Sequence, residues 1–394
     1  MVASELLSKI NERRVLEFIQ AHGPSSRADM ARACGMSAPT VSKAAASLIR
    51  HGFLEESGLS EGFGRPGKLL QLDAKSANVL WVVVDAGTCW TGGARLDGVI
   101  AKETMRSFST PSTYSELLLA IVSQVAEIVD GKMSDVSSRF RGVGVSLPGL
   151  LNTRRDQTVM SPNLHLLDGQ SLATDLSLRL GLRCVALQES HALCVGERMY
   201  GAARGMDDFA MLDVSTGLGL GIFSGGRLLT GNSGLAGELG HITVERAGIR
   251  CGCGNQGCLE TVATDSAFAR EISQILGAPV GITEAIETMR IRPADTNEVV
   301  ERTIDYLAIA VAAVINVFNP STLFLHGMLA GSDPAVFDRV LDEVKKRTLK
   351  PSLADCRILQ SQGNKRLGAA AGIILALTDD LAPSMASFES GSLK

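Results

Sequence analysis

The sequence predicts an α/β protein that begins with a small winged helix-turn-helix domain. Near the N-terminus, short helical patterns separated by a glycine turn are followed by a hairpin pattern. From residue 78 onward, apolar strand patterns alternate with helical ones. Two strand openings, VVVDAGT at 82–88 and AMLDVST at 210–216, resemble each other, which is consistent with a duplicated α/β unit.

Three helices are predicted in the first domain. Residues 11–20 carry apolar side chains at helical spacing. Ser26, with a carboxylate three residues later, resembles the start of a capping box for a second helix, which is expected to end at Gly35. The third helix is expected to begin at Ser37, with Pro39 in the first turn, where a missing N–H costs little.

The exposed N-terminal face of the third helix is predicted to contact DNA, because short hydroxyl donors and a cation suit base edges and phosphates. The strands GFLEESG and GRPGKLLQL then predict a wing with a basic tip near a phosphate backbone or minor groove. A helical protein-interaction module is the alternative. The predicted DNA-binding residues are Ser37, Pro39, Thr40, Ser42, Lys43, Arg65 and Lys68.

Composition sets outer limits on the class of protein. A chain of 394 residues is too long for one ordinary domain. Residues 1–72 carry nine Lys and Arg against seven Asp and Glu, which permits a local DNA-binding surface although the whole chain has a net charge of −4. No apolar run is long enough to cross a bilayer, and the N-terminus is charged where a signal peptide is apolar. We therefore expect a cytoplasmic protein that is not bound to a membrane.

The most informative stretch is GELGHITVERAGIRCGCGNQGCLE at 237–260. Three thiols and an imidazole close together are ligands of tetrahedral zinc, and four protein ligands are typical of a structural site. Ordinary buried thiols in a reducing cytosol are the alternative. Glu238 and Glu260 flank these ligands, so a metal would also fix two acceptors suited to a polyol. The predicted zinc ligands are His241, Cys251, Cys253 and Cys258.

The segment LAGELGH followed by CGCGNQGCLE resembles the signature of the ROK family, which contains sugar kinases and sugar-responsive transcriptional repressors. The resemblance implies an actin-like ATPase fold of two α/β lobes with a sugar cleft between them. It also implies that the histidine binds zinc through one ring nitrogen and sugar through the other. ROK repressors carry a winged helix-turn-helix at the N-terminus, whereas the kinases lack it. The sugar-binding positions that the resemblance implies are Gly149, Asn163, Gln188, Glu189, Glu238, His241 and Glu260.

Asn163 is equally explained as a turn residue after a proline. The kinase machinery departs from the family pattern at two places. Gln188 and Glu189 stand where kinases carry Asn-Asp, and a displacement of about 1 Å in a reacting group can cost on the order of a hundredfold in rate. The first phosphate turn, 85–89, reads DAGTC instead of Asp-x-Gly-Gly-Thr, while the second, STGLGLG at 215–221, is nearly intact. We therefore expect that the protein is not an enzyme.

The predicted function is a sugar-responsive, DNA-binding transcriptional regulator that acts as a repressor. Its expected partners are operator DNA and a sugar or sugar phosphate, and its expected assembly is a homodimer or homotetramer. An ATP-dependent sugar kinase with an added DNA-binding domain is the alternative, and a regulator that answers to a partner protein is a third. The expected domains are a winged helix-turn-helix at 1–72, a first lobe at 78–190, a second lobe with the zinc site at 191–379 and a flexible tail at 380–394.

Overall fold

The computed structural model describes residues 2–59, 67–75 and 78–381. Within them the chain forms two compact units. The first unit contains the chain up to Leu147, Ser171–Leu187 and the chain from Ala369 onward, and the second contains Pro148–Gln170 and Gln188–Gly368. From the sequence, each lobe was expected to be one continuous segment. In the structure, residues 148–170 belong to the second unit, and the C-terminal helix from Ala369 onward belongs to the first.

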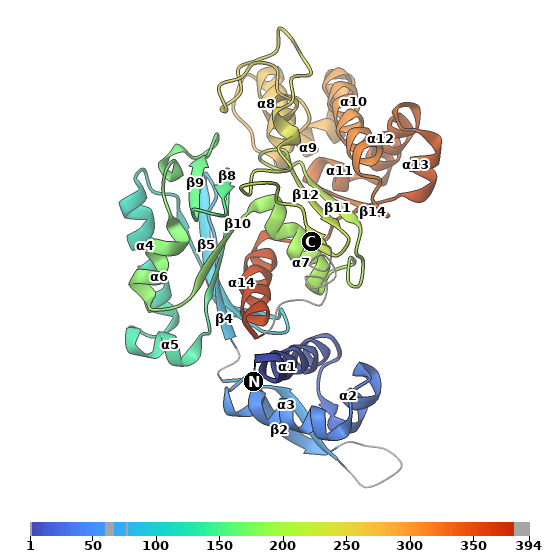
Figure 1. Ribbon diagram of the computed structural model, residues 1–394. Helices are drawn as coiled ribbons and strands as arrows, with labels where there is room; N and C mark the ends of the chain where they lie inside the picture. Colours follow the sequence, from blue (N-terminus) through green and yellow to red (C-terminus); the bar gives the residue numbers. More distant parts are fainter. Residues whose placement is uncertain (1, 60–66, 76–77, 382–394) are drawn as a thin grey trace. The chain divides into compact units, whose positions relative to one another are not determined.

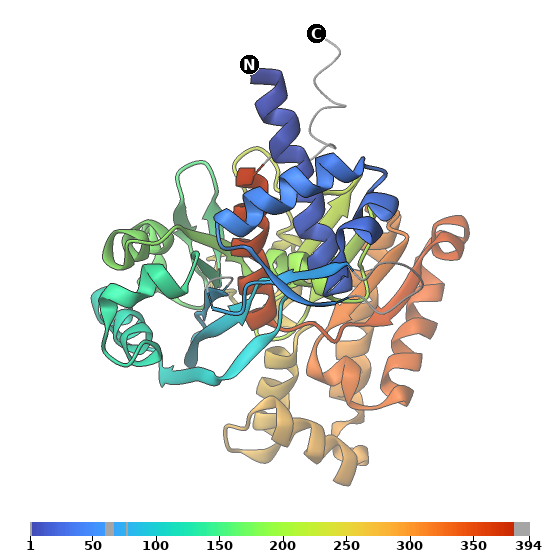
Figure 2. The same cartoon turned by 90° about the horizontal axis from the view of Figure 1, so that it is seen from below.

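The N-terminal domain consists of three helices and a small sheet of strand order β1-β3-β2 (Figure 2). Ser26 caps the second helix by accepting the N–H of Asp29, and Gly35 ends it at a φ of 61°. Ser37 caps the third helix in the same way, accepting the N–H of Thr40. The elements are α1 (Val2–His22), β1 (Ser25–Ser26), α2 (Arg27–Cys34), α3 (Ala38–Arg50), β2 (Leu54–Leu59) and β3 (Lys68–Leu72).

Strands β2 and β3 form the predicted wing hairpin. They pair antiparallel, with Leu54 opposite Leu72 and Leu59 opposite Lys68. The helices close over a common apolar core of fully buried side chains, which includes Leu16, Val41 and Leu48. This arrangement is a winged helix-turn-helix, as the sequence predicts, and Arg65 lies outside the described residues.

The first unit also contains a five-stranded sheet of order β10-β7-β4-β5-β6. Strands β4 and β7 are parallel, while β5 pairs antiparallel with both neighbours. Figure 1 shows α4 and α6 on one face and α14 on the other. At Gly144 of β7 a Cβ atom would lie 1.8 Å from the carbonyl oxygen of Ala369, so glycine permits α14 to pack directly on the sheet. The elements are β4 (Asn78–Val83), β5 (Thr88–Arg95), β6 (Ile100–Ser109), α4 (Tyr114–Ile128), α5 (Val136–Arg139), β7 (Val143–Leu147), α6 (Leu172–Leu180), β10 (Cys184–Gln188) and α14 (Lys365–Leu381).

The second unit has a sheet of order β13-β12-β11-β14-β15. Numbered along the chain within each sheet, both sheets have the strand order 5-4-1-2-3, and in both the first strand is parallel to the fourth. The repeated strand opening in the sequence therefore reflects a duplicated fold. The elements are β11 (Phe209–Asp213), β12 (Gly219–Ser224), β13 (Arg227–Leu228), β14 (Thr322–His326) and β15 (Arg357–Gln360), with a separate hairpin of β8 (Leu150–Asn152) and β9 (Gln157–Met160).

Helices surround the second sheet and supply most of its apolar core (Figure 1). The long α10 is capped by Asn319 in the left-handed region, at φ 46°, where the sequence FNPST predicts its end. None of the described helices is long and apolar enough to span a bilayer. The helices are α7 (Glu189–Tyr200), α8 (Asp265–Leu276), α9 (Ile282–Ile291), α10 (Pro293–Phe318), α11 (Met328–Ser332), α12 (Pro334–Arg347) and α13 (Lys350–Asp355).

Candidate functional site

A pocket in the second unit contains every residue that the sequence assigns to sugar binding. Its walls come from loops that follow strands and from two short 3-10 turns, Leu239–His241 and Leu259–Thr261. The free volume is small, about 70 Å³, because polar side chains converge across it. The predicted residues that line it are Gly149, Asn163, Gln188, Glu189, Glu238, His241 and Glu260.

Gln188 spans one side of this pocket. Its Nε2 donates to the carbonyl oxygen of Gly149 and to Oε1 of Glu238, each at 3.0 Å. Its own Oε1 is buried and has no hydrogen-bond partner among the described residues. Gly149 has a φ of +99°, and a Cβ atom there would lie 2.6 Å from the carbonyl oxygen of Met160, so a side chain is excluded. The amide therefore orients Glu238 and retains one unused acceptor.

Glu238 lies beside His241, and Glu260 lies beside Cys251. The Oε2 atom of Glu238 lies 3.7 Å from Nε2 of His241. Burial raises the pKa of the Glu238 carboxyl. Glu260 accepts the N–H of Leu218 on Oε2 at 3.0 Å, while its Oε1 lies 3.7 Å from the sulfur of Cys251. Both carboxyls are thus held by the protein, as rigid acceptors for a polyol require.

Glu189 has an ionic partner that the sequence analysis missed. The Nζ atom of Lys365 lies 2.6 Å from Oε1 of Glu189 and 3.9 Å from Oδ2 of Asp213, and the side chains of Lys365 and Glu189 are about 15% exposed. Asp213 ends β11 and also lines the pocket. The carboxylate at the position of the kinase base is therefore neutralised by a mostly buried ammonium group.

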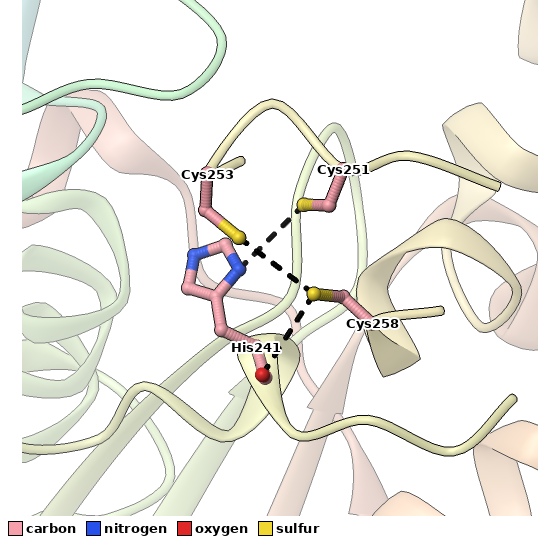
Figure 3. A group of neighbouring side chains, drawn as sticks. All are labelled: His241, Cys251, Cys253 and Cys258. Atoms are coloured by element: carbon pink, nitrogen blue, oxygen red, sulfur yellow. Dashed lines mark hydrogen bonds between the residues drawn. The ribbon is translucent and has the colours of Figure 1, made fainter. Parts of the chain in front are cut away.

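Four side chains converge beside the pocket in a geometry that fits a metal ion (Figure 3). The ligand atoms of His241, Cys251, Cys253 and Cys258 all lie within 4.8 Å of one another. The Cys251 sulfur lies 3.7 Å from Nδ1 of His241, and the Cys253 and Cys258 sulfurs are also 3.7 Å apart. Ligands about 2.3 Å from a tetrahedral zinc are about 3.8 Å from one another. The cluster therefore has the size of a tetrahedral site, and the other ring nitrogen of His241 faces Glu238.

The loop that carries the cysteines depends on glycine. Gly257 has a φ of +71°, and a Cβ atom there would lie 1.6 Å from the carbonyl oxygen of Glu245. Glu245 in turn accepts from Arg302 at 2.8 Å and from the hydroxyl of Tyr306 at 2.5 Å, both on α10. Burial raises the pKa of the Cys251 and Cys258 thiols, so loading a metal releases protons.

Most of the predicted DNA-contacting face of α3 is exposed to solvent. Ser37, Pro39, Ser42 and Lys43 are exposed, whereas Thr40 is half-buried. The hydroxyls of Ser37 and Thr40 lie 2.7 Å apart, so they bond to each other in the free protein. On the wing, Nζ of Lys68 lies 2.5 Å from Oε2 of Glu56, and Glu56 also accepts a hydrogen bond from Arg27. A phosphate contact by Lys68 therefore has to compete with a neighbouring carboxylate.

Comparison with known proteins identifies the families that the chain matches. The model of the ROK family matches residues 83–378. The chain belongs to the ROK family. The model of the MarR family matches residues 9–61, which cover the helix-turn-helix. The N-terminal domain and the rest of the chain thus each match a known family.

Three relatives illustrate the range of ROK proteins. The chain is 26% identical to the xylose repressor of Bacillus subtilis over 345 residues, covering 86% of this chain and 88% of the repressor. It is 29% identical to the glucokinase of Thermotoga maritima over 262 residues, covering 63% of this chain and 81% of the kinase. A crystal structure of a ROK family transcriptional regulator, a homologue of the E. coli MLC protein, superposes with a TM-score of 0.79 at 24% identity, covering 95% and 98% of the two chains. The last comparison shows that the winged helix-turn-helix and the actin-like ROK fold occur together.

Proposed function

We propose that this ROK protein is a sugar-responsive DNA-binding transcriptional regulator, a repressor, that works in the cytoplasm. The observation that carries the proposal is the presence in one chain of an exposed recognition helix and of a pocket lined by carboxylates and an amide beside a His/Cys cluster. The similarity to the xylose repressor over most of both chains supports it. Sugar binding shifts the population of conformations, and a homodimer or homotetramer offers two recognition helices to two half-sites of an operator.

The carboxyl groups of the pocket favour an effector that carries no negative charge where it binds. Four carboxyl groups line it, and the one ammonium group beside them in the described chain, that of Lys365, is already paired with Glu189. A phosphate group would therefore meet negative charge without a free cation. Sugar hydroxyls instead donate to the carboxylates, and they replace the hydrogen bond that Gln188 makes to Glu238 across the narrow pocket. Among sugars and sugar phosphates, the unphosphorylated sugar is the proposed ligand of these side chains.

The proposed metal is structural zinc, bound by Nδ1 of His241 and by the sulfurs of Cys251, Cys253 and Cys258. A bound zinc neutralises the thiolates and locks the imidazole ring. Nε2 of His241 then remains to meet a sugar hydroxyl beside Glu238. The zinc site thus orients part of the pocket and has no open position for catalysis.

The proposed DNA contacts lie on α3 and the wing. Lys43 makes no ion pair with any described residue and is available to a phosphate. Ser42 is exposed one residue earlier and is suited to a base edge, while Ser37, Pro39 and Thr40 form the first turn. Arg65 and Lys68 at the wing complete the proposed contacts.

A second candidate function is sugar phosphorylation, which the second phosphate turn and the similarity to a glucokinase favour. The ion pair between Glu189 and Lys365 argues against it. A catalytic base must accept a proton from the sugar hydroxyl, and an ammonium group 2.6 Å away stabilises the ionised carboxylate and weakens it as a base. In addition, Cys89 is fully buried and occupies the phosphate turn where kinases have a hydroxyl. We therefore propose that the chain does not transfer phosphate.

A thermal-shift screen of the full chain against hexoses, pentoses, amino sugars and their phosphates, with and without magnesium ATP, tests both functions. A ligand at a hundred times its dissociation constant stabilises the native state by about 2.7 kcal/mol. The expected result is a shift with one unphosphorylated sugar and no contribution from ATP. Genomic fragments selected by the protein should then be released when that sugar is added. Consumption of ATP with the sugar, or selected DNA that does not respond to it, would contradict the proposal.

A further inference from the structure

The second unit contains another cavity, larger than the sugar pocket, with a volume of about 240 Å³. It lies between the C-terminal half of α7 and the segment 360–367, which joins β15 to α14. No residue lines both cavities. Leu193 and Leu367 form apolar walls, and Tyr200 closes one side. The cavity is therefore distinct from the sugar pocket, although both lie in the second unit.

A buried carboxylate faces this cavity. Glu197 is 4% exposed, and its Oε1 accepts the N–H of Ala202 at 2.7 Å. Its Oε2 has no hydrogen bond or ion pair to any described residue, and no Lys or Arg side chain lines the cavity. Burying an ionised carboxylate is costly unless a donor or a cation compensates it. One oxygen of Glu197 is therefore available to a partner that the protein itself does not supply.

Two glycines pack closely against that carboxylate. A Cβ atom at Gly201 would lie 2.4 Å from Oε1 and 2.8 Å from Oε2 of Glu197. A Cβ atom at Gly363 would lie 3.1 Å from Oε2. A side chain at either position would crowd the carboxylate. The cavity thus combines apolar walls with one buried carboxyl group.

We propose that this cavity is a second small-molecule site, which binds a small organic cation through Glu197. A primary ammonium or guanidinium group donates to Oε2, and a short apolar body fills the space beside Leu193 and Leu367. The volume suits a molecule smaller than a drug-sized ligand. Helix α7 begins at Glu189 in the sugar pocket and reaches Glu197 here, and Lys365 follows the loop that borders the cavity. A cation bound here therefore contacts the same helix and loop that hold Glu189 in the first pocket.

The test is a titration of the full chain with 4-fluorobenzylammonium chloride, followed by ¹⁹F NMR, with 4-fluorobenzyl alcohol as the neutral probe. We expect saturable binding of the ammonium probe about tenfold or more tighter than that of the alcohol. Glu197→Gln keeps an acceptor for Ala202 and should weaken the ammonium probe by a similar factor. Glu287→Gln, at an exposed carboxylate on α9, is the matched control and should bind it as the wild type does. Gly363→Ala leaves the charge in place, crowds Oε2 and should also weaken binding, which keeps the test valid if Glu197→Gln does not fold.

The position of the probe distinguishes this cavity from the carboxylates of the sugar pocket. Crystals soaked with 4-bromobenzylammonium should show anomalous bromine density between α7 and segment 360–367. Bromine in the pocket of Glu238 would overturn the proposal. So would equal affinity of the wild type and both cavity variants, equal affinity for the ammonium and alcohol probes, or the absence of saturable binding, because each means that the carboxylate is satisfied by water alone.

Discussion

Replacement of Cys253 by serine is the most direct test of the proposed zinc site. The four ligand atoms form one compact set, and the Cys253 sulfur lies 3.7 Å from the Cys258 sulfur. Structural zinc in comparable four-ligand sites contributes about 10–16 kcal/mol of apparent binding free energy, or roughly 3 kcal/mol per ligand. A serine hydroxyl is a poor substitute for a thiolate, so we expect zinc affinity to fall by about two orders of magnitude. The sugar response should weaken as well, since His241 loses its fixed orientation.

Zinc content per chain, measured by mass spectrometry, and competition with a chelator of known affinity provide the assay. Cys356→Ser is the control, because Cys356 is a free thiol that lies outside the cluster, although it is more buried than Cys253. It should retain zinc and respond to sugar as the wild type does. If Cys253→Ser holds one zinc per chain with affinity within threefold of the control, the tetrahedral assignment is wrong. If zinc is lost while the sugar response stays normal, the link from the metal to His241 is wrong.

Three further predictions follow from particular contacts. Lys365→Met should destabilise the second unit by about 3 kcal/mol, because it removes the cation that pairs with the mostly buried Glu189 carboxylate. The added change Glu189→Gln should recover most of this loss, and additive effects in urea unfolding would contradict the pairing. Lys43→Ala should weaken DNA binding to all sequences alike and lower the slope of log affinity against log salt concentration by about one, whereas Ser42→Ala should alter sequence preference. Binding to a randomised DNA pool at several salt concentrations distinguishes the two effects. Burial lowers the pKa of His191 to about 4. Its contribution to stability is therefore complete above pH 6.5, and about 3 kcal/mol is lost as the pH falls toward 4. The ring resonances of His191, assigned by their loss in His191→Leu, should remain those of the neutral form at pH 5.

Features encoded by neighbouring residues could be predicted from the sequence. The caps at Ser26, Gly35 and Ser37 depend on hydrogen bonds within a few residues, and the structure confirms all three. The His/Cys cluster draws its ligands from 18 consecutive residues, with Gly257 permitting the tight return of the chain. The pocket positions came from the family resemblance, which carries long-range information that spacing alone lacks; the structure brings them together, and their roles remain predictions.

Contacts between distant segments could not be predicted in this way. Lys365 and Glu189 are 176 residues apart, and no local pattern marks either as a partner of the other. The sequence of α14 indicates tight packing through small residues, but not that the helix would pack on the sheet of the first unit at Gly144. The same holds for Glu197, whose open oxygen results from glycines both near it and far from it in the chain.

The ion pair also alters the argument about catalysis. From the sequence, the replacement of Asp by Glu at position 189 suggests a base displaced by about one methylene, a defect that small shifts of the backbone can repair. In the structure the Nζ atom of Lys365 lies 2.6 Å from Oε1 of Glu189, so we propose that the defect is electrostatic, because an ammonium group stabilises the ionised carboxylate whatever the length of the side chain. Glu189→Asp alone should therefore not create kinase activity. A variant that also removes Lys365 would take away this stabilisation, but the altered first phosphate turn at Cys89 would still lack the hydroxyl that kinases of the family carry. Phosphorylation of the effector sugar by Glu189→Asp with Lys365 intact would refute this reasoning.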